Sequence, residues 1–365
     1  MTKKSLLILL SATLAATPAL AEGLRNLPFN KDEKRIEVTD RVWATTPGEA
    51  SVCIWKDDKL AAVTYTVDDN WASDVDWWLE MGEKYNFRAT WFLIVNWVLE
   101  RPGFGGSWDV WKKVFDAGHE VQSHTVSHGA NKDLTLDEEY GKAITIIEEN
   151  MPGNRVRVLA FPGSGLQNDP EVARKYYIGA RSVTGHVNPA QNINYMSTHS
   201  LGGGICLTET MANGGRHWAY TPDTINPESK LFRGWTCSHF HGVNTPEARE
   251  AAEKQFQYLK ENEKDYWVAP FGAVVQYGQQ RDTAELKVTK NNPKEIALLL
   301  TSKMAPEYFD YPLTVKVTVP KDWKNATAKQ ADKEIETKLV EHEGHKYVFV
   351  QVVPGRGEAN LVANN

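Results

Sequence analysis

The 365-residue sequence predicts an α/β fold: a distorted (β/α) barrel of about seven strands, followed by an all-β, sandwich-like domain. Between residues 60 and 281, short apolar runs alternate with helical segments, which is typical of parallel strands joined by helical crossovers. The run 61–67 is apolar almost throughout, as expected for a strand covered on both faces. After Arg281 the apolar period changes to two, and several short strands in about 80 residues favour a small β-sandwich.

Each element follows from its own periodicity, taken in chain order. The strands expected in the barrel are 61–67, 89–95, 120–123, 157–161, 234–241 and 266–270. The helices expected between them are 75–84, 108–117, 136–150, 169–177 and 246–262. The segment 187–230 is rich in Gly, Asn, Thr and Pro, and we expect it to form loops that shape one side of a cleft. The strands expected beyond the barrel are 283–288, 296–301, 313–319, 334–340 and 347–353.

The first 21 residues have the pattern of a signal peptide. Lys3 and Lys4 precede a mostly apolar run at 6–14, and Ala19-Leu20-Ala21 forms a small-x-small cleavage site. This run is too short for a membrane span, and no other long uncharged apolar run follows. We therefore expect an exported protein, periplasmic or secreted, with no stable membrane span after cleavage. The predicted division is a signal peptide at 1–21, a barrel domain at 22–282 and a β-sandwich accessory domain at 283–365.

The amino-acid composition restricts which kinds of molecule the protein can bind. Lys and Arg number 41 against 47 Asp and Glu, a net charge of -6, which argues against nucleic acid as a partner. Of the three cysteines, Cys53, Cys206 and Cys237, two could pair in an oxidising compartment, and the absence of a Cys-x-x-Cys pattern argues against a cysteine-based metal site. Most of the thirteen tryptophans are expected in the core, with one or two lining a carbohydrate groove.

Two short motifs follow the ends of predicted strands, where barrel enzymes place their chemistry. Asp68 and Asp69 follow the strand 61–67, and His124 and His128 follow the strand 120–123. A helical turn would place the two histidines on one face. Two histidines and one carboxylate are a recurrent ligand set for a catalytic divalent metal, and the second carboxylate is then free to act as a base. The pattern predicts a metal-dependent hydrolase.

The same motifs resemble those of the polysaccharide deacetylases, the NodB-like group called carbohydrate esterase family 4. That family carries a Thr-Phe-Asp-Asp-Gly motif and a His-(Ser/Thr)-x-x-His motif. The counterparts are Thr66-Val67-Asp68-Asp69-Asn70 and His124-Thr125-Val126-Ser127-His128, the latter preceded by Gly118-His119-Glu120-Val121-Gln122-Ser123. The resemblance covers about residues 60–277 and implies that 22–282 is a catalytic domain acting on an acetylated polysaccharide or oligosaccharide.

The resemblance also implies a role for each site residue. Asp68 would be the general base, and His241, in the fifth motif, would protonate the leaving group. A divalent metal, usually zinc in such enzymes, would be held by Asp69, His124 and His128. The candidate substrate-binding residues are Trp71, Pro162 and His239.

The third motif departs from the family pattern Arg-x-Pro-x-Gly. It reads Ala160-Phe161-Pro162-Gly163, so the arginine that orients the base is missing, and Arg181 or Arg216 could substitute for it from another loop. A backbone N–H near Phe161 is the candidate oxyanion donor. The fourth motif, of the Asp-x-x-Asp-Trp type, has no clean counterpart.

The favoured substrate is an N-acetylglucosamine-type glycan, because an amide leaving group needs firm protonation. Two alternatives stay open: an esterase that removes O-acetyl groups at the same site, and a catalytically impaired carbohydrate-binding protein. A serine esterase is disfavoured, because Pro162 occupies the position that Gly-x-Ser-x-Gly requires before Ser164. Metal content and acetate release together separate these classes.

Overall fold

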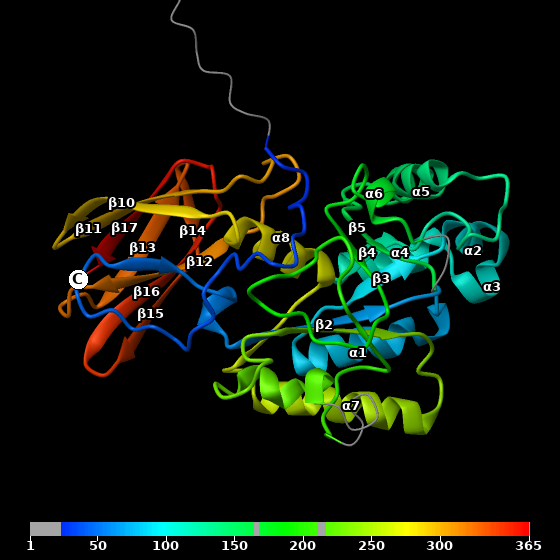
Figure 1. Ribbon diagram of the computed structural model, residues 1–365, viewed down its shortest axis with the longest axis horizontal. Helices are drawn as coiled ribbons and strands as arrows, with labels where there is room; N and C mark the ends of the chain where they lie inside the picture. Colours follow the sequence, from blue (N-terminus) through cyan, green and yellow to red (C-terminus); the bar gives the residue numbers. More distant parts are fainter. Residues whose placement is uncertain (1–22, 164–167, 210–216, 365) are drawn as a thin grey trace, which may run out of the picture.

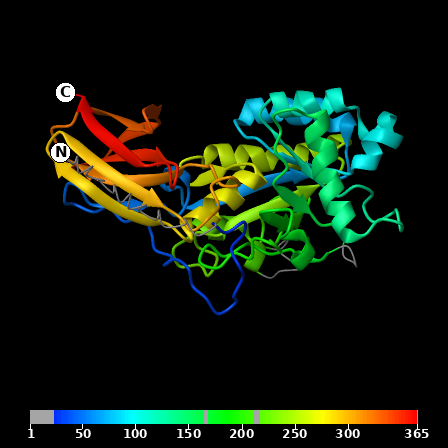
Figure 2. The ribbon, with the colours of Figure 1, turned by 90° about the horizontal axis from the view of Figure 1, so that it is seen from above.

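The computed structural model describes residues 23–163, 168–209 and 217–364, which form two lobes side by side (Figure 1). One lobe is a parallel α/β half-barrel and the other an antiparallel β-sandwich, which confirms the predicted fold class. The view from above also shows the two lobes next to each other along the long axis of the molecule (Figure 2). The expected signal peptide lies outside the described residues. Across the described ranges, no helix is long and apolar enough to cross a membrane.

The half-barrel is a parallel sheet with the strand order β6-β5-β4-β3-β2-β8-β7, and β9 also pairs with β2. Its central strand β2 is buried at all seven positions. β8 runs along one edge of β2, while β3 and β9 share the other edge. The strands are β2 (Ala61–Val67), β3 (Thr90–Leu93), β4 (Glu120–Ser123), β5 (Val158–Ala160), β6 (Gly179–Arg181), β7 (Leu201–Gly202), β8 (Trp235–Phe240) and β9 (Tyr266–Val268).

Helices cover this sheet, and the two longest begin with a capping side chain. Thr135 and Glu138 form a capping box at the start of α5, and the Thr245 side chain caps α7. The α-helices are α1 (Val75–Tyr85), α2 (Val95–Glu100), α3 (Pro102–Gly105), α4 (Trp108–Asp116), α5 (Leu136–Asn150), α6 (Pro170–Ala173), α7 (Pro246–Glu261) and α8 (Phe271–Arg281). Short 3-10 helices lie at Lys56–Asp58, Ala72–Asp74, His217–Ala219 and Thr221–Ile225.

The second lobe consists of two antiparallel sheets, with the orders β1-β12-β16-β15 and β10-β11-β17-β13-β14. The apolar residues of β12 face the core between the sheets, while Lys316 and Thr318 face the N-terminal segment. The strands are β1 (Ala50–Val52), β10 (Glu285–Asn292), β11 (Glu295–Thr301), β12 (Leu313–Val319), β13 (Asn325–Gln330), β14 (Lys333–Ile335), β15 (Thr337–His342), β16 (His345–Val352) and β17 (Glu358–Asn364).

The two lobes share one continuous core rather than a thin contact. One cluster of buried side chains runs from Trp55 and Phe271 to Val315 in the sandwich. α8 lies between the lobes with all its residues buried (Figure 1). Lys316 and Asp58 form a buried ion pair across the same boundary, with Nζ 2.6 Å from Oδ2. β1 also pairs with β12, so a strand from the range 22–282 completes a sheet of the sandwich. The boundary at 282/283 stays a prediction.

Some sequence expectations need correction. The expected strand 334–340 is divided at Glu336 into β14 and β15, which belong to different sheets. The expected helix 169–177 is reduced to α6. The strand β6 and the helix α8 were not predicted, because a three-residue strand has no period and α8 has no exposed polar face. Cys53, Cys206 and Cys237 are all free, so none of the cysteine pairings that the sequence left open is formed.

Candidate metal centre and active site

A sharp bend at the end of β2 brings two consecutive aspartates to one site. Asp69 and Asn70 both adopt left-handed backbone conformations, with φ of 63° and 50°. Asparagine tolerates this region better than most residues, which explains Asn70 where the family has glycine. The buried Asn70 side chain accepts a 2.8 Å hydrogen bond from the N–H of Ile94 and donates to its carbonyl. The ends of β2 and β3 are thereby fixed to each other, and both aspartates stay at the strand's carboxyl end.

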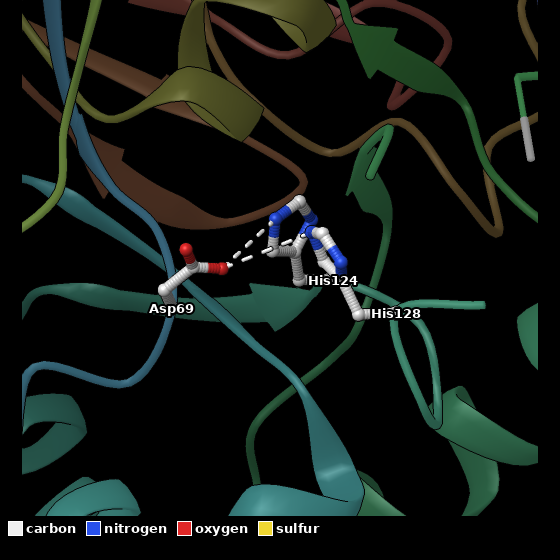
Figure 3. Close-up of side chains that lie close together, drawn as sticks. All are labelled: Asp69, His124 and His128. Carbon is white, nitrogen blue, oxygen red and sulfur yellow. Dashed lines mark ion pairs between the residues drawn. The ribbon is translucent and has the colours of Figure 1, made fainter. Parts of the chain in front are cut away.

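Asp69 meets both histidines of the second motif. Its Oδ1 lies 3.5 Å from Nε2 of His124 and 3.9 Å from Nε2 of His128 (Figure 3). One ligand atom from each of the three residues falls within 4.8 Å of the others. The three candidate metal ligands predicted from the sequence therefore converge on one point, although they come from two separate strand ends.

The two histidines are placed by a loop, which corrects the expectation of a helical turn. Thr125 and His128 have φ of 71° and 57°, outside the helical region. The loop is held from behind by the buried Glu139 of α5, whose carboxylate accepts hydrogen bonds from the backbone N–H and the hydroxyl of Ser127. A charged side chain with such partners fixes the loop firmly.

A backbone contact sets the tautomer of His124. Its Nδ1 lies 2.8 Å from the carbonyl oxygen of Ala160, so Nδ1 carries the proton and donates it to that carbonyl. Nε2 then presents its lone pair towards Asp69, as a metal-ligating histidine requires. Burial lowers the pKa of His124 and favours this neutral form.

The residues fit a divalent metal ion. Oδ1 of Asp69 is buried and has no hydrogen-bond partner within the described part of the chain, although it faces two imidazole nitrogens. An unpaired buried carboxylate oxygen is costly unless a cation satisfies it. Two neutral imidazoles and one carboxylate also form a donor set that suits zinc and leaves a coordination position open. Asp69, His124 and His128 would hold the ion.

The buried carboxylate of Asp68 is paired with Arg181, a residue of β6. Arg181 is fully buried, and its Nη2 donates to Oδ2 of Asp68. Arg181 and Ala160 are directly paired across β5 and β6. The arginine missing from position 160 is thus supplied by the neighbouring strand, as one of the two sequence-based candidates suggested. The other candidate, Arg216, lies outside the described residues.

The arginine keeps Asp68 ionised. Burial by itself would raise the pKa of Asp68, but the positive charge of Arg181, with smaller effects from neighbouring histidines, lowers it below its usual value. The other oxygen, Oδ1, is buried without a hydrogen-bond partner in the described structure. Asp68 therefore offers one ionised, unoccupied oxygen next to the candidate metal site, which is the arrangement required of a general base.

The histidines of the fifth motif differ in their surroundings. Nε2 of His241 lies 3.5 Å from Oδ2 of Asp69, and the side chain is 52% exposed. His239 is more enclosed, and its Nδ1 lies 2.8 Å from Oγ of Ser200. Burial, followed by the charge of Arg181, lowers the pKa of His239 to about 4, so this ring is neutral at pH 7. His241 is the better placed proton donor.

The remaining candidates line the site less directly. The ring of Trp71 packs on Gly242, where an added Cβ would lie 2.6 Å from it. Pro162 is buried. The backbone N–H of Phe161 already donates to the carbonyl of Arg181, which removes it as an oxyanion donor; a neighbouring N–H in that role stays a prediction. The segment 187–230 borders the site as expected, because Ser200 contacts His239 and Gly203 donates to its carbonyl.

Sequence reasoning missed several supporting groups. Ser200 also accepts a 3.2 Å hydrogen bond from Nη1 of Arg181, so it connects that arginine to His239. The Ala160 carbonyl and the Glu139 carboxylate position the metal-site histidines. Ala160 and Ser200 lie next to the ends of short strands, whereas Glu139 lies in a helix and had no such sequence signal.

Known proteins share this architecture. Residues 56–178 match the family model described as polysaccharide deacetylase. A gellan lyase from a Bacillus species is 35% identical over 93% of this chain, which covers only 14% of that relative's length. The aligned region includes most of both lobes.

Solved structures with weaker similarity include three bacterial proteins. A family 4 pseudoenzyme from Bacillus anthracis is 18% identical, with a TM-score of 0.38 over 59% of this chain and 66% of that one. A polysaccharide deacetylase from Bacillus cereus is 22% identical, with a TM-score of 0.32 over 38% and 46%. A mutant peptidoglycan deacetylase from Bacillus subtilis is 16% identical, with a TM-score of 0.36 over 58% and 88%.

These TM-scores lie below 0.5, so the assignment depends on the sequence match, the parallel half-barrel and the motifs at its strand ends. Residues 56–178 thus match the polysaccharide deacetylases, and the half-barrel that contains them has the NodB-like fold of carbohydrate esterase family 4.

Proposed function

We propose that this protein is a metal-dependent hydrolase that removes acetyl groups from a carbohydrate. The observation that carries the proposal is the convergence of Asp69, His124 and His128 within 4.8 Å, beside the buried Asp68. A lone aspartate–histidine cluster is not specific, but this one lies at the carboxyl ends of strands inside the family match. We also propose that the protein is exported, on the basis of the signal-peptide pattern at residues 1–21.

The chain's own residues divide the work of hydrolysis. A bound divalent ion would supply Lewis-acid polarisation of the acetyl carbonyl and lower the pKa of a water molecule towards about 7. Asp68 removes the proton from the attacking water, using the oxygen that Arg181 does not occupy. His241, exposed on the far side of the Asp69 carboxylate, delivers a proton to the departing amine or alcohol. No covalent bond to the enzyme forms.

The favoured substrate is a glycan of the N-acetylglucosamine type. An amine is a poor leaving group until it is protonated, and the site places His241 within 3.5 Å of the candidate metal ligand Asp69. The same residues also serve ester hydrolysis, so an O-acetylated glycan is the second candidate. A catalytically impaired carbohydrate-binding protein is the third.

The test combines metal content with acetate release. The full chain, loaded with zinc, is assayed on chitooligosaccharides, peptidoglycan, acetylxylan and acetylated alginate, with Asp68→Asn as the matched inactive control. We expect one metal ion per chain and acetate release from N-acetylated substrates that Asp68→Asn reduces at least a hundredfold. Full metal occupancy without acetate release from any of the four would refute the deacetylase proposal and leave the carbohydrate-binding alternative.

A further inference from the structure

A cavity of about 410 Å³ lies at the other end of the barrel from the metal centre. Lys59 lines it just before β2 begins, whereas Asp69 follows the end of β2. Seven strand residues at about 3.3 Å each separate Lys59 from Asp69 by roughly 20 Å. The cavity is bounded by the ends of α1 and α7, by β9 and by Lys338 of β15, so both lobes contribute to it. Its volume falls in the range of small-molecule sites.

Positive charge at this cavity is not balanced. Four lysines line it against a single acidic residue, Glu263, in a chain whose net charge is -6. Glu263 is already engaged, because its carboxylate pairs with Lys260 and its carbonyl accepts from Lys59. The ammonium groups of Lys264 and Lys338 have no ion pair or hydrogen bond within the described ranges, although both residues line one cavity from different lobes. Such a like-charged pair favours a bound anion.

The lysines also act on one another electrostatically. Burial lowers the pKa of Lys59; the nearby carboxylate of Asp57 opposes that shift, and the positive charge of Lys338 adds to it. An anion bound between the ammonium groups of Lys59 and Lys338 would relieve their mutual repulsion.

A second, independent feature is the hydroxyl of Tyr65. This residue of β2 lines the cavity and is fully buried, and its Oη has no hydrogen-bond partner in the described structure. Its ring packs against Phe87 and Phe256, which also line the cavity. A buried hydroxyl without a partner costs about 1–3 kcal/mol. The cavity therefore combines an aromatic wall, an unused hydrogen-bonding group and unpaired lysines.

We propose that this cavity binds a carboxylated sugar unit, a hexuronate residue of an acidic glycan. The lysines would receive the carboxylate, while the aromatic wall and the Tyr65 hydroxyl would contact the ring and its hydroxyls. This inference goes beyond the deacetylase proposal and does not depend on it. Because Lys264 and Lys338 belong to different lobes, the bound unit would also connect the barrel to the sandwich.

The test uses D-glucuronate, N-acetylglucosamine and inorganic phosphate as probes of the full chain, with binding measured by calorimetry and by the shift in unfolding temperature. We expect glucuronate to bind and to weaken at high salt. Lys264→Ala/Lys338→Ala should lower its affinity at least tenfold, and Lys321→Ala/Lys324→Ala, which removes two exposed lysines elsewhere on the sandwich, should not. Equal binding of N-acetylglucosamine, or glucuronate affinity retained in Lys264→Ala/Lys338→Ala, would overturn the proposal. Phosphate binding as strong as glucuronate binding would overturn its sugar component.

Tyr65→Phe provides a second test, because it should weaken ligand binding without lowering the stability of the free protein. Without ligand, this variant should be as stable as the wild type or more stable, because it removes an unsatisfied hydroxyl. With glucuronate, its affinity should fall severalfold, and unchanged affinity would contradict the role of Tyr65. Acetate release by the Lys264→Ala/Lys338→Ala variant should match the wild type, so a failure of this site and a failure of the deacetylase proposal are told apart.

Discussion

Arg181→Ala removes the guanidinium that pairs with the buried carboxylate of Asp68. Arg181 is 0% exposed and Asp68 is 3% exposed, so water cannot replace the lost partner. Breaking a buried ion pair from one side costs about 3–5 kcal/mol. The chain can relieve part of that cost by protonating Asp68, because burial would then raise the pKa of that carboxyl, opposed only by the smaller effects of the neighbouring histidines. A protonated Asp68 cannot serve as a base, so turnover at pH 7 should fall within the range of about 10²–10⁴-fold.

The assay is the pH dependence of kcat for acetate release, measured alongside thermal unfolding. Activity of Arg181→Ala should recover as the pH is raised, a shift that a general loss of stability would not produce. The matched control is Arg174→Ala, which removes a surface pair with Glu171 and should cost no more than about 1 kcal/mol. Because Ala160 and Arg181 are paired across β5 and β6, Ala160→Arg/Arg181→Ala should restore part of the activity. The reasoning is refuted if Arg181→Ala keeps wild-type stability, turnover within twofold and an unchanged pH profile.

Three further predictions follow from the geometry. His128→Ala should lose the bound metal, whereas Asp68→Asn should keep it, as metal analysis of the purified variants will show; equal metal loss in both would contradict the separate roles. Burial lowers the pKa of His119 to about 4 in the folded state. As the pH falls below about 6.5, the unfolded chain therefore binds a proton at His119 that the folded chain does not. The free energy of unfolding should fall between about pH 6.5 and pH 4, by up to about 3 kcal/mol. His119→Asn removes this titrating group and should flatten the pH dependence of stability in urea titrations. Asparagine is chosen because it can still accept the hydrogen bond from the N–H of Ala89. An unchanged pH dependence would show that other groups cause it. A chain ending at Arg281 should aggregate, because the core shared with the sandwich would be exposed, and a soluble, fully active product in size-exclusion chromatography would show that the sandwich is dispensable.

The sequence by itself determined the fold class and the candidate residues of the site. A fully apolar strand at 61–67 and a capped amphipathic helix at 136–150 have patterns that depend only on local residues, and their bounds match the structure. Asp68, Asp69, His124 and His128 were identified in the same way, because each pair follows a strand within a few residues. The period-two run 313–319 indicated the second lobe equally directly.

Only the tertiary structure decided which residues support the site. Arg181 lies 113 residues from its partner Asp68, on a strand of three residues that has no readable period. The histidine loop depends on left-handed residues and on Glu139 of a later helix, which no helical spacing predicts. The division of 334–340 between two sheets, the burial of α8 between the lobes and the lysine-lined cavity arise likewise from contacts between distant segments. Local patterns determine which secondary structure each segment can form, whereas long-range pairing determines which charged and hydrogen-bonding groups come into contact.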